Sequence, residues 1–492
     1  MAVDPFPSPQ NSNVNAFNWW RQLNRYQWLV LTVAALGWLF DTMDQQLFVV
    51  ARTPAMNTLL TDAIATNSAS EGMSEDDLAK EQVRLKKERV TAFGTYATTV
   101  FMLGWATGGL IFGMFGDRLG RVRTIMITVT IYSLFTGLSA LSTGWFDFMF
   151  YRFITGLGVG GEFAAGVSLV AEVMPAAVRP YALGLLQALS AVGNTMAAGI
   201  SLILQPSAIY AGWEGWRWLF VIGVLPALLV VFILRNVKEP DSWKRAKAAA
   251  DAGNDPVAKQ LGDMRQLFIN PLLRFHTIIG VLLAMTGVIA LWGIGFWTPE
   301  LIRNNVLRDV PAQDKDYYAS IALLLQNMAA FFGIYGFSVI AGSMGRRPAF
   351  LISFLLGAAS VVLVFGFMTR IDQIYWMVPI LGFCTLMVFG GFAIYFPELY
   401  PTRLRSTGTS FCYNIARYLA AFFPFILGTL TLQLVDPSRG EGAGLASFTW
   451  LSSMGSVDNA FRYAVLFVAL IYIVGIITVL FAPETKDKPL PE

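Results

Sequence analysis

Five charged side chains interrupt long apolar runs of the sequence. An unpaired charge inside a membrane costs at least ~2.5–3.5 kcal/mol, so each of these groups needs an opposite charge or a water-filled cavity. Charged residues that are present in apolar runs despite this cost are the first candidates for binding protons or a charged solute. The five residues are Asp41, Asp44, Arg152, Glu162 and Arg417.

Asp44 and Arg152 are expected to form a pair. Each lies about six residues, or about 9 Å at 1.5 Å per residue, from the same end of its apolar run. Asp41 shares a helix face with Asp44. Two acids facing one arginine leave one carboxylate under-compensated, so Asp41 is the better candidate for carrying a proton. The alternative for Asp44 and Arg152 is a static ion pair near the interface.

Glu162 and Arg417 lie deeper in their runs. Glu162 follows Arg152 by about 15 Å of helix. It is either a second proton site or a neutral carboxylic acid hydrogen bonded to a neighbour. Arg417 lies about 17 Å into its run, near the middle of the membrane. A fixed positive charge there suits a carboxylate of a substrate, and the alternative is a pair with Asp41 or Glu162 that closes the cavity.

Neutral polar side chains in the apolar runs supply further candidates for substrate contacts. Amides inside a membrane join helices as often as they bind a ligand, so both interpretations stay open for each. The candidates are Gln45, Gln46, Gln187, Asn194, Trp292, Gln326, Asn327, Tyr413 and Asn414. His276 stands at the start of a run and is interpreted as an interfacial residue, not a proton relay.

The residue types that enzymes need are scarce in this chain. It has one histidine and two cysteines, and both cysteines lie in apolar runs, as small packing residues do. Because no acid–histidine, serine–histidine or metal-binding set is visible at membrane depth, we expect no enzyme, no cofactor and no metal. The net charge of +3 is too small to indicate a nucleic-acid partner.

Membrane-spanning helices must position these residues. Only 14% of the 492 residues are charged and 55% are hydrophobic, whereas about a quarter of a soluble domain is charged. Apolar segments long enough to cross a ~30 Å hydrocarbon core predict an all-α membrane protein with twelve transmembrane helices. They lie near 27–50, 91–115, 122–142, 147–172, 180–205, 216–235, 272–297, 317–342, 349–368, 375–396, 406–432 and 460–481.

Lysine and arginine indicate the orientation of these helices. With both termini in the cytoplasm, the cytoplasmic segments hold 20 of the 35 basic residues and the outer loops hold 13. Six of the 13 lie in the long outer loop 51–90, and long loops weigh little in the positive-inside rule. We therefore expect cytoplasmic termini. No cleavable signal is visible, which favours a plasma or bacterial inner membrane.

Part of the long outer loop is expected to be helical. From Glu75 to Arg89, acids and bases recur at helical spacing. This pattern favours a solvated helix that continues into the second span, and the alternative is a regulatory or partner site.

Two sets of landmarks show that one unit occurs twice. Gly120-Arg121 recurs as Gly345-Arg346, 225 residues later, and Glu172-x-x-Pro-x-x-x-Arg179 recurs as Glu398-x-x-Pro-x-x-x-Arg405, 226 residues later. Glu239-Pro240 and Pro483-Glu484 form a third pair. The repeat predicts two six-helix bundles with the substrate between them. The expected order is a tail 1–26, a bundle 27–235, a linker 236–271, a bundle 272–482 and a tail 483–492.

The loop Gly113-Met-Phe-Gly-Asp117-Arg118-Leu-Gly-Arg121-Val-Arg resembles the signature loop of the major facilitator superfamily, and the likeness extends over 27–488. Arg152-Phe-Ile-Thr-Gly-Leu-Gly-Val-Gly-Gly-Glu162 resembles the fourth span of the metabolite:proton symporters, most closely the sialate and monocarboxylate group. Asp41-Thr-Met-Asp44 is similar to that branch's paired-aspartate motif. Pro397-Glu-Leu-Tyr-Pro-Thr-Arg-Leu-Arg and Pro483-Glu-Thr-Lys are shared with sugar porters.

The resemblance implies a charged gate at the cytoplasmic ends of the helices. Acids and bases in a tight, glycine-bounded turn can pair with each other and with a helix dipole, whereas topology alone explains only the bases. The expected gate comprises Asp117, Arg118, Arg121, Glu172, Arg179, Glu398 and Arg405. Gly342 and Ser343 replace Asp117 and Arg118 in the second copy, so an equally strong second gate is doubtful.

These features predict a secondary transporter that works by alternating access. The first hypothesis is a monomeric, proton-coupled symporter of a small organic anion, monocarboxylate or sialate-like. Given the resemblance, Asp41, Asp44, Arg152 and Glu162 are assigned to proton coupling. The alternatives are a sugar or polyol porter with a structural Arg417, an exporter of drug-like compounds, and a non-transporting sensor of the same fold. A channel is disfavoured because the two halves carry different charges.

Overall fold

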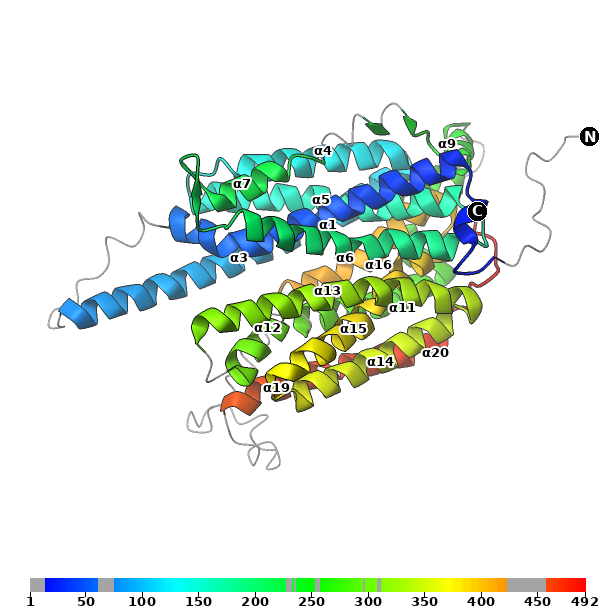
Figure 1. Cartoon of the computed structure of the whole chain (residues 1–492). Helices are drawn as coiled ribbons and strands as arrows, with labels where there is room; N and C mark the ends of the chain where they lie inside the picture. The colour runs from blue at the N-terminus through cyan, green and yellow to red at the C-terminus, as the bar shows by residue number, and fades with distance from the viewer. Residues whose placement is uncertain are drawn as a thin grey trace, which may run out of the picture.

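The computed structural model describes residues 14–60, 75–226, 232–233, 236–252, 257–294, 297–307, 311–422 and 457–492. Most of these residues are helical, and the long helices run roughly along one common direction (Figure 1). Nine helices in the described ranges are long and apolar enough to cross a membrane.

The first half of the chain supplies six long or apolar helices. A short 3₁₀ helix, η1 (Trp19–Gln22), precedes them, and a hairpin of β1 (Ile209–Tyr210) and β2 (Trp213–Glu214) precedes the sixth. The helices are α1 (Arg25–Leu59), α3 (Glu75–Arg118), α4 (Arg121–Ser139), α5 (Trp145–Val173), α6 (Arg179–Ile203) and α7 (Gly215–Ile222).

The linker and the second half follow the same plan. The linker contains α9 (Asp241–Ala252), η2 (Ala258–Gln260) and α10 (Gln266–Ile269). The second half contains α11 (Pro271–Gly293), α12 (Thr298–Leu301), the π-helical turn η4 (Ile302–Val306), α13 (Ala312–Ser343), α14 (Arg346–Phe367), α15 (Ile371–Leu399), η5 (Thr402–Leu404), α16 (Arg405–Ala420), α19 (Val457–Val468) and α20 (Ile471–Phe481).

Each of the twelve predicted spans corresponds to helix in the described residues, in the predicted order, so the twelve-helix fold class is confirmed. For the spans predicted at 216–235 and 406–432, parts lie outside the described residues. The span predicted at 460–481 is two helices, because a turn at Ala469 and Leu470 separates α19 from α20.

The predicted helix in the outer loop is present. The charged stretch from Glu75 is continuous with the second span, so α3 is 44 residues long. Its first turns project beyond the other helices in Figure 1.

Glycines bring α3 and α5 into backbone contact. A Cβ on Gly104 or Gly108 of α3 would overlap a carbonyl oxygen of α5, and a Cβ on Gly156 or Gly160 of α5 would overlap a carbonyl of α3. Small residues permit such close approach between membrane helices. This packing fixes the position of α5, which carries Arg152 and Glu162.

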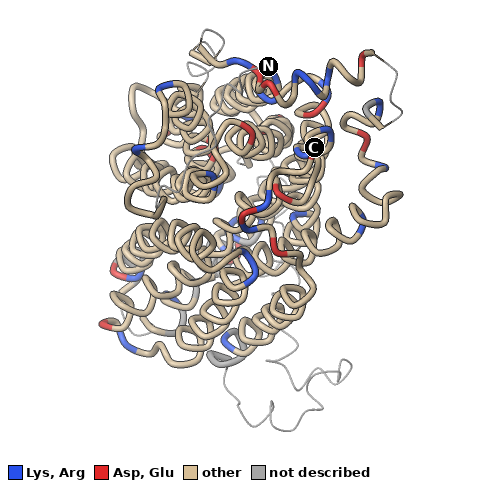
Figure 2. Tube along the Cα trace, turned by 90° about the vertical axis from the view of Figure 1, so that its right-hand side faces the viewer, with Lys and Arg blue, Asp and Glu red and all other residues tan. Residues whose placement is uncertain are grey.

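Charged residues gather at one end of the helix bundle. We call this the latch end; it carries the C-terminal tail, η1, the linker helix α9 and the turn between α3 and α4 (Figure 1). Figure 2 looks onto this end and shows acids and bases along the linker and at helix ends, while the helices themselves are mostly uncharged.

Candidate functional site

A cavity of about 480 Å³ lies between the two halves of the chain. Side chains of α1, α3 and α6 line it from the first half, and side chains of α11, α13, α15 and α16 line it from the second. The predicted substrate-contact residues that line it are Gln45, Gln46, Gln187, Asn194, Trp292, Gln326, Asn327, Tyr413 and Arg417.

Arg417 is held rigidly at the wall of this cavity. Its guanidinium carbon lies 4.2 Å from the centre of the Trp105 ring and 4.1 Å from that of Tyr413. Its Nη1 donates to the Tyr413 carbonyl (3.0 Å) and to Asn414 Oδ1 (2.9 Å). Among the described residues, its Nε has no hydrogen-bond partner. The side chain is 3% exposed, so the charge is buried.

Asn414 is not among the residues that line the cavity, contrary to prediction. Its Nδ2 donates to the Ser410 carbonyl (2.9 Å) and to Ser410 Oγ (3.1 Å), and its Oδ1 accepts from Arg417. The side chain also packs against Gly109 of α3. Asn414 therefore positions Arg417 instead of contacting a solute.

Asn194 and Asn327 line the cavity but also contact each other. Asn194 Nδ2 donates to Asn327 Oδ1 (3.1 Å), which joins α6 of the first half to α13 of the second. The interpretation as amides that join helices holds for this pair.

Arg152 and Asp44 lie together as their equal depth suggests. Arg152 Nη1 is 3.7 Å from Asp44 Oδ2, and both side chains are fully buried. The guanidinium also donates to Ser139 Oγ (2.7 and 3.0 Å) and to Thr155 Oγ1 (3.1 Å), and it lies 4.6 Å from the centre of the Phe220 ring. Arg152 is thus held by α4, α5 and α7 as well as by α1.

Asp41 and Glu162 form a second buried acidic group. Asp41 lies within electrostatic reach of Glu162, Asp44 and Arg417. Its two carboxylate oxygens have no hydrogen-bond partner in the described residues. Glu162 Oε1 occupies the space beside Gly37, where any Cβ would collide with it. Glycine at position 37 therefore makes room for Glu162 against α1.

The acidic group lies behind the cavity wall. Asp41, Asp44, Arg152 and Glu162 are absent from the residues that line the large cavity. Glu162 instead lines a void of about 10 Å³, and Trp38 lines both the void and the cavity. Trp38 packs on Phe163 (4.7 Å), which stacks on Tyr413 (4.2 Å). Trp38 thus lies between the void that Glu162 lines and the large cavity.

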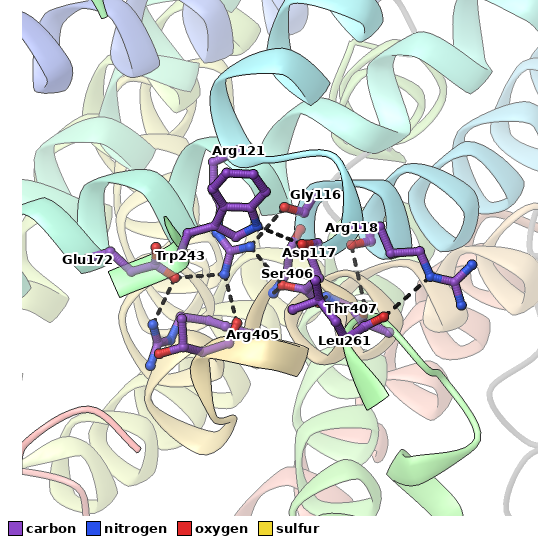
Figure 3. Close-up of polar contacts among 12 residues, drawn as sticks. Gly116, Asp117, Arg118, Arg121, Glu172, Trp243, Leu261, Arg405, Ser406 and Thr407 are labelled. Atoms are coloured by element: carbon purple, nitrogen blue, oxygen red, sulfur yellow. Dashed lines mark hydrogen bonds and ion pairs between the residues drawn. The ribbon is translucent and has the colours of Figure 1, made fainter. Parts of the chain in front are cut away.

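At the latch end, Asp117 joins the two halves (Figure 3). Its carboxylate accepts hydrogen bonds from the backbone N–H of Ser406 (3.1 Å) and of Thr407 (2.8 Å), and from Thr407 Oγ1 (2.6 Å). These N–H groups belong to the first turn of α16, where a negative charge is favoured by the helix dipole.

A buried chain of charges runs beside Asp117 (Figure 3). Arg121 contacts Asp117 (3.1 Å) and Glu172 (2.8 Å), and Glu172 also binds Arg405 of the second half (2.8 Å). Arg121 further donates to the Thr402 carbonyl across the interface (2.8 Å). We call Asp117, Arg121, Glu172 and Arg405 the ionic latch.

Three of the predicted gate residues make other contacts. Arg179, expected to pair with the loop charges, donates to the Ala171 carbonyl (2.9 Å). Arg118 donates to the Leu261 carbonyl of the linker (3.3 Å). Glu398 pairs with Arg346 (2.7 Å), and both residues belong to the second half, so this pair does not connect the two halves. Among the described residues, Glu398 of the second copy therefore forms no ion pair between the halves.

Linker residues contact the ionic latch, a role that the sequence analysis did not predict. Trp243 Nε1 donates to the Asp117 carbonyl (2.6 Å), and Ser242 Oγ donates to Glu172 (3.2 Å). The C-terminal tail contributes the Pro491 carbonyl, which accepts from Arg405 (2.7 Å). A tryptophan in an otherwise charged segment was the only available signal.

The third repeat pair has a structural role. Glu239 accepts from the backbone N–H of Val122 and Arg123, and Glu484 accepts from that of Arg346 and Arg347. Each glutamate thus caps the helix that follows a positive-φ glycine. Burial opposes ionisation of Glu484, but these N–H groups outweigh it and hold its pKa below the usual value. At Glu239 burial prevails and raises the pKa.

Comparisons with known proteins agree with this geometry. The model of the family "Sugar (and other) transporter" matches residues 46–492. A putative metabolite transport protein of Haemophilus influenzae is 28% identical over 81% of this chain and 89% of its own. The cis,cis-muconate transport protein of Acinetobacter baylyi is 27% identical over 79% and 84%. The proton:xylose symporter XylE has a TM-score of 0.68 at 19% identity and covers 94% of this chain and 98% of its own.

The fold and the matched family agree over almost the whole chain. No cluster of three or more metal-binding side chains occurs within the described residues. The cavity between two six-helix halves suits a solute, and the matched relatives are transport proteins. The chain belongs to the sugar and other transporter family of the major facilitator superfamily, and it is a multi-pass membrane transporter, not an enzyme.

Proposed function

We propose that this transporter is a proton-coupled symporter of a small organic anion, monocarboxylate or sialate-like. The observation that carries the proposal is Arg417, a buried charge at the cavity wall. Among the described residues, no carboxylate lies within ion-pair distance of it. A buried cation is stabilised when an anion binds beside it, so a substrate carboxylate completes the site.

The surroundings of Arg417 suit a carboxylate. The rings of Trp105 and Tyr413 fix the plane of the guanidinium. Nη1 donates to Asn414, and Nε has no hydrogen-bond partner among the described residues. A planar, immobilised guanidinium binds a carboxylate with two parallel hydrogen bonds at little entropic cost. The cavity volume of about 480 Å³ is ample for a small organic acid. A relative named for cis,cis-muconate transport supports this substrate class.

The proposed coupling to protons rests on the position of Asp41 relative to Arg417 and Glu162. This carboxylate acts electrostatically on both Arg417 and Glu162. While Asp41 is ionised it competes with a substrate anion for the positive charge of Arg417. A proton on Asp41 removes this competition, so proton binding and anion binding favour each other. Asp44, which lies 3.7 Å from Arg152, places a further carboxylate near Asp41, and repulsion between the two carboxylates favours a proton on one of them.

The conformation supports alternating access. The ionic latch closes the latch end, while residues near the opposite helix ends, such as Thr53 and Thr95, line the cavity. We place the latch end and both termini in the cytoplasm, because that side holds 20 of the 35 basic residues. The cavity then faces outward.

The test is uptake into proteoliposomes with an imposed pH gradient. An inward proton gradient should drive accumulation of one or more carboxylates from a panel that also includes xylose, and a protonophore should abolish accumulation. Arg417→Gln should abolish binding, and Arg417→Lys should weaken it by about tenfold or more because lysine cannot form the paired hydrogen bonds. Arg370→Gln, at an exposed arginine, is the matched control. Uptake that persists unchanged without a gradient contradicts the proposal.

A neutral sugar or polyol is the second candidate. The similarity to a xylose symporter and the amides Gln187 and Gln326 in the cavity favour it. In that case sugar uptake should survive Arg417→Gln, whereas the organic-anion proposal requires its loss.

A further inference from the structure

The segment before α1 is inserted between the two halves at the latch end. Trp19 of η1 is 3% exposed. Its Nε1 donates to Tyr335 Oη of α13 (2.9 Å), and Tyr335 Oη donates to the Ala16 carbonyl (3.2 Å). The indole also stacks on the ring of Tyr181 of α6, with 6.4 Å between ring centres. One side chain thus contacts the first half through Tyr181 and the second half through Tyr335.

The position of this contact is set by the internal repeat. The ionic latch joins α3 to α16, and the repeat relates this interface to the one between α13 and α6. Gly113 of α3 packs on Ser410 of α16, and the equivalent contact, with glycine and serine exchanged, joins Ser338 of α13 to Gly184 of α6. The offsets of 225 and 226 residues match these pairs one to one.

The two equivalent interfaces differ where the first has its acid. Asp117 binds Thr407 in the first interface. The residues equivalent to them are Gly342 and Tyr181, and the Tyr181 ring lies where a Cβ of Gly342 would be. Loss of the aspartate side chain therefore leaves room for an aromatic ring. That ring is the surface on which Trp19 stacks.

We propose that the N-terminal segment Asn15–Gln22 is a detachable clamp that replaces the missing second ionic latch. With Trp19 docked, α6 and α13 are tied together at the latch end. When these helices separate, Tyr181 and Tyr335 move apart and Trp19 keeps at most one of them. The clamp therefore favours the conformation that is closed at the latch end, by the free energy of the contact that is lost.

A simple anchor for the N-terminus would need contacts with one half only. Trp19 already stacks on Trp28 of α1 (6.3 Å) and on Tyr181, both in the first half. The hydrogen bond to Tyr335 crosses to the other half, which an anchor to the first half does not require. A change that removes only this hydrogen bond therefore distinguishes a clamp between the halves from an anchor for the N-terminus.

The test measures opening at the α6–α13 interface. A single cysteine is placed at Ser338, a fully buried residue, in a background with Cys384→Ala and Cys412→Ala. The purified protein is reconstituted in nanodiscs, where both ends are reachable, and the rate of maleimide labelling is measured. Trp19→Ala should raise the rate about three- to tenfold, since opening of the parent protein breaks either the hydrogen bond from Trp19 to Tyr335 or the ring contact with Tyr181.

Trp20→Ala is the matched control. Trp20 is the next residue, is 45% exposed, and donates only to Phe17 of its own segment. The labelling rate of the Trp20→Ala protein should equal that of the parent protein. Tyr335→Phe removes one hydroxyl, is expected to fold, and should raise the rate a few-fold. Equal labelling of the Trp19→Ala and Trp20→Ala proteins overturns the proposal; if Trp19→Ala does not fold, an unchanged rate for Tyr335→Phe does so.

Discussion

In the proposed mechanism, Asp41 and Arg417 have different parts in coupling proton binding to anion binding. Arg417 lines the cavity and can meet a solute directly, whereas Asp41 is 1% exposed and lies behind the wall. The two charges interact through a medium of low dielectric, where Coulomb energies are larger than in water. In this mechanism a proton on Asp41 changes the affinity of Arg417 for an anion, although the proton and the substrate do not touch.

Replacement of Asp41 by asparagine mimics the protonated carboxyl. We expect Asp41→Asn to bind the substrate anion with an affinity that no longer depends on pH, because the competing negative charge is gone. Exchange of substrate across proteoliposomes should persist, but accumulation driven by a pH gradient should be lost.

Glu162→Gln provides the comparison for Asp41→Asn. If Glu162 carries the transported proton, this change, and not Asp41→Asn, eliminates accumulation. Accumulation by the Asp41→Asn protein at the parental level would contradict the assignment of Asp41.

At the scale of elements, the contact between α3 and α5 determines where Arg152 and Glu162 lie. Gly108 and Gly160 place one helix directly on backbone carbonyls of the other. From this position Arg152 reaches Asp44 of α1. The same reasoning applies to Gly37, whose missing side chain accommodates Glu162.

A methyl group at this contact should be costly. We expect Gly160→Ala to destabilise the protein by about 1–3 kcal/mol, because the new Cβ overlaps the Trp105 carbonyl of α3. Thermal unfolding in detergent, followed by tryptophan fluorescence, measures the effect.

Gly199→Ala is the control in α6. Nothing lies within 4 Å of a Cβ at this position, so alanine should stabilise the helix by about 0.5–1 kcal/mol. If Gly160→Ala lowers the melting temperature no more than Gly199→Ala does, the overlap argument for Gly160 is wrong.

At the scale of the whole molecule, the ionic latch connects the two halves, the linker and the C-terminal tail. Asp117 binds the first turn of α16 and the linker tryptophan Trp243, and Arg405 binds both Glu172 and the tail. Opening of the latch end must therefore release four segments together.

Asp117→Asn should weaken the latch with little change in shape. Loss of the charge at the N-terminus of α16 removes about 1–2 kcal/mol from the closed conformation. A cysteine at Ser410, buried at the interface, should then react with maleimide roughly five to thirty times faster. Asp241→Asn, at an acid with an exposed side chain, should leave the rate unchanged.

Sequence reasoning reached the architecture more readily than the contacts. Span length, basic residues and the 225-residue offset indicate two related bundles without any knowledge of structure. Depth along a helix also placed Asp44 beside Arg152. Contacts that depend on rotation about the helix axis were out of reach, as for Asn414, which supports Arg417. So were contacts made by Trp243 and Trp19, because segments between helices carry no periodic pattern that fixes their position.

Position 342 is glycine, whereas the equivalent position in the first half is Asp117, and this difference has a consequence for evolvability. Where two equivalent interfaces are built from the same contacts, the same kinds of side chain are required at both. Trp19 belongs to no repeated segment. Changes around Trp19 therefore alter the α6–α13 interface without changing the residues that line the cavity. With the proposed clamp, the balance between the two conformations can be adapted to a new environment while Arg417 and Asp41 remain as they are.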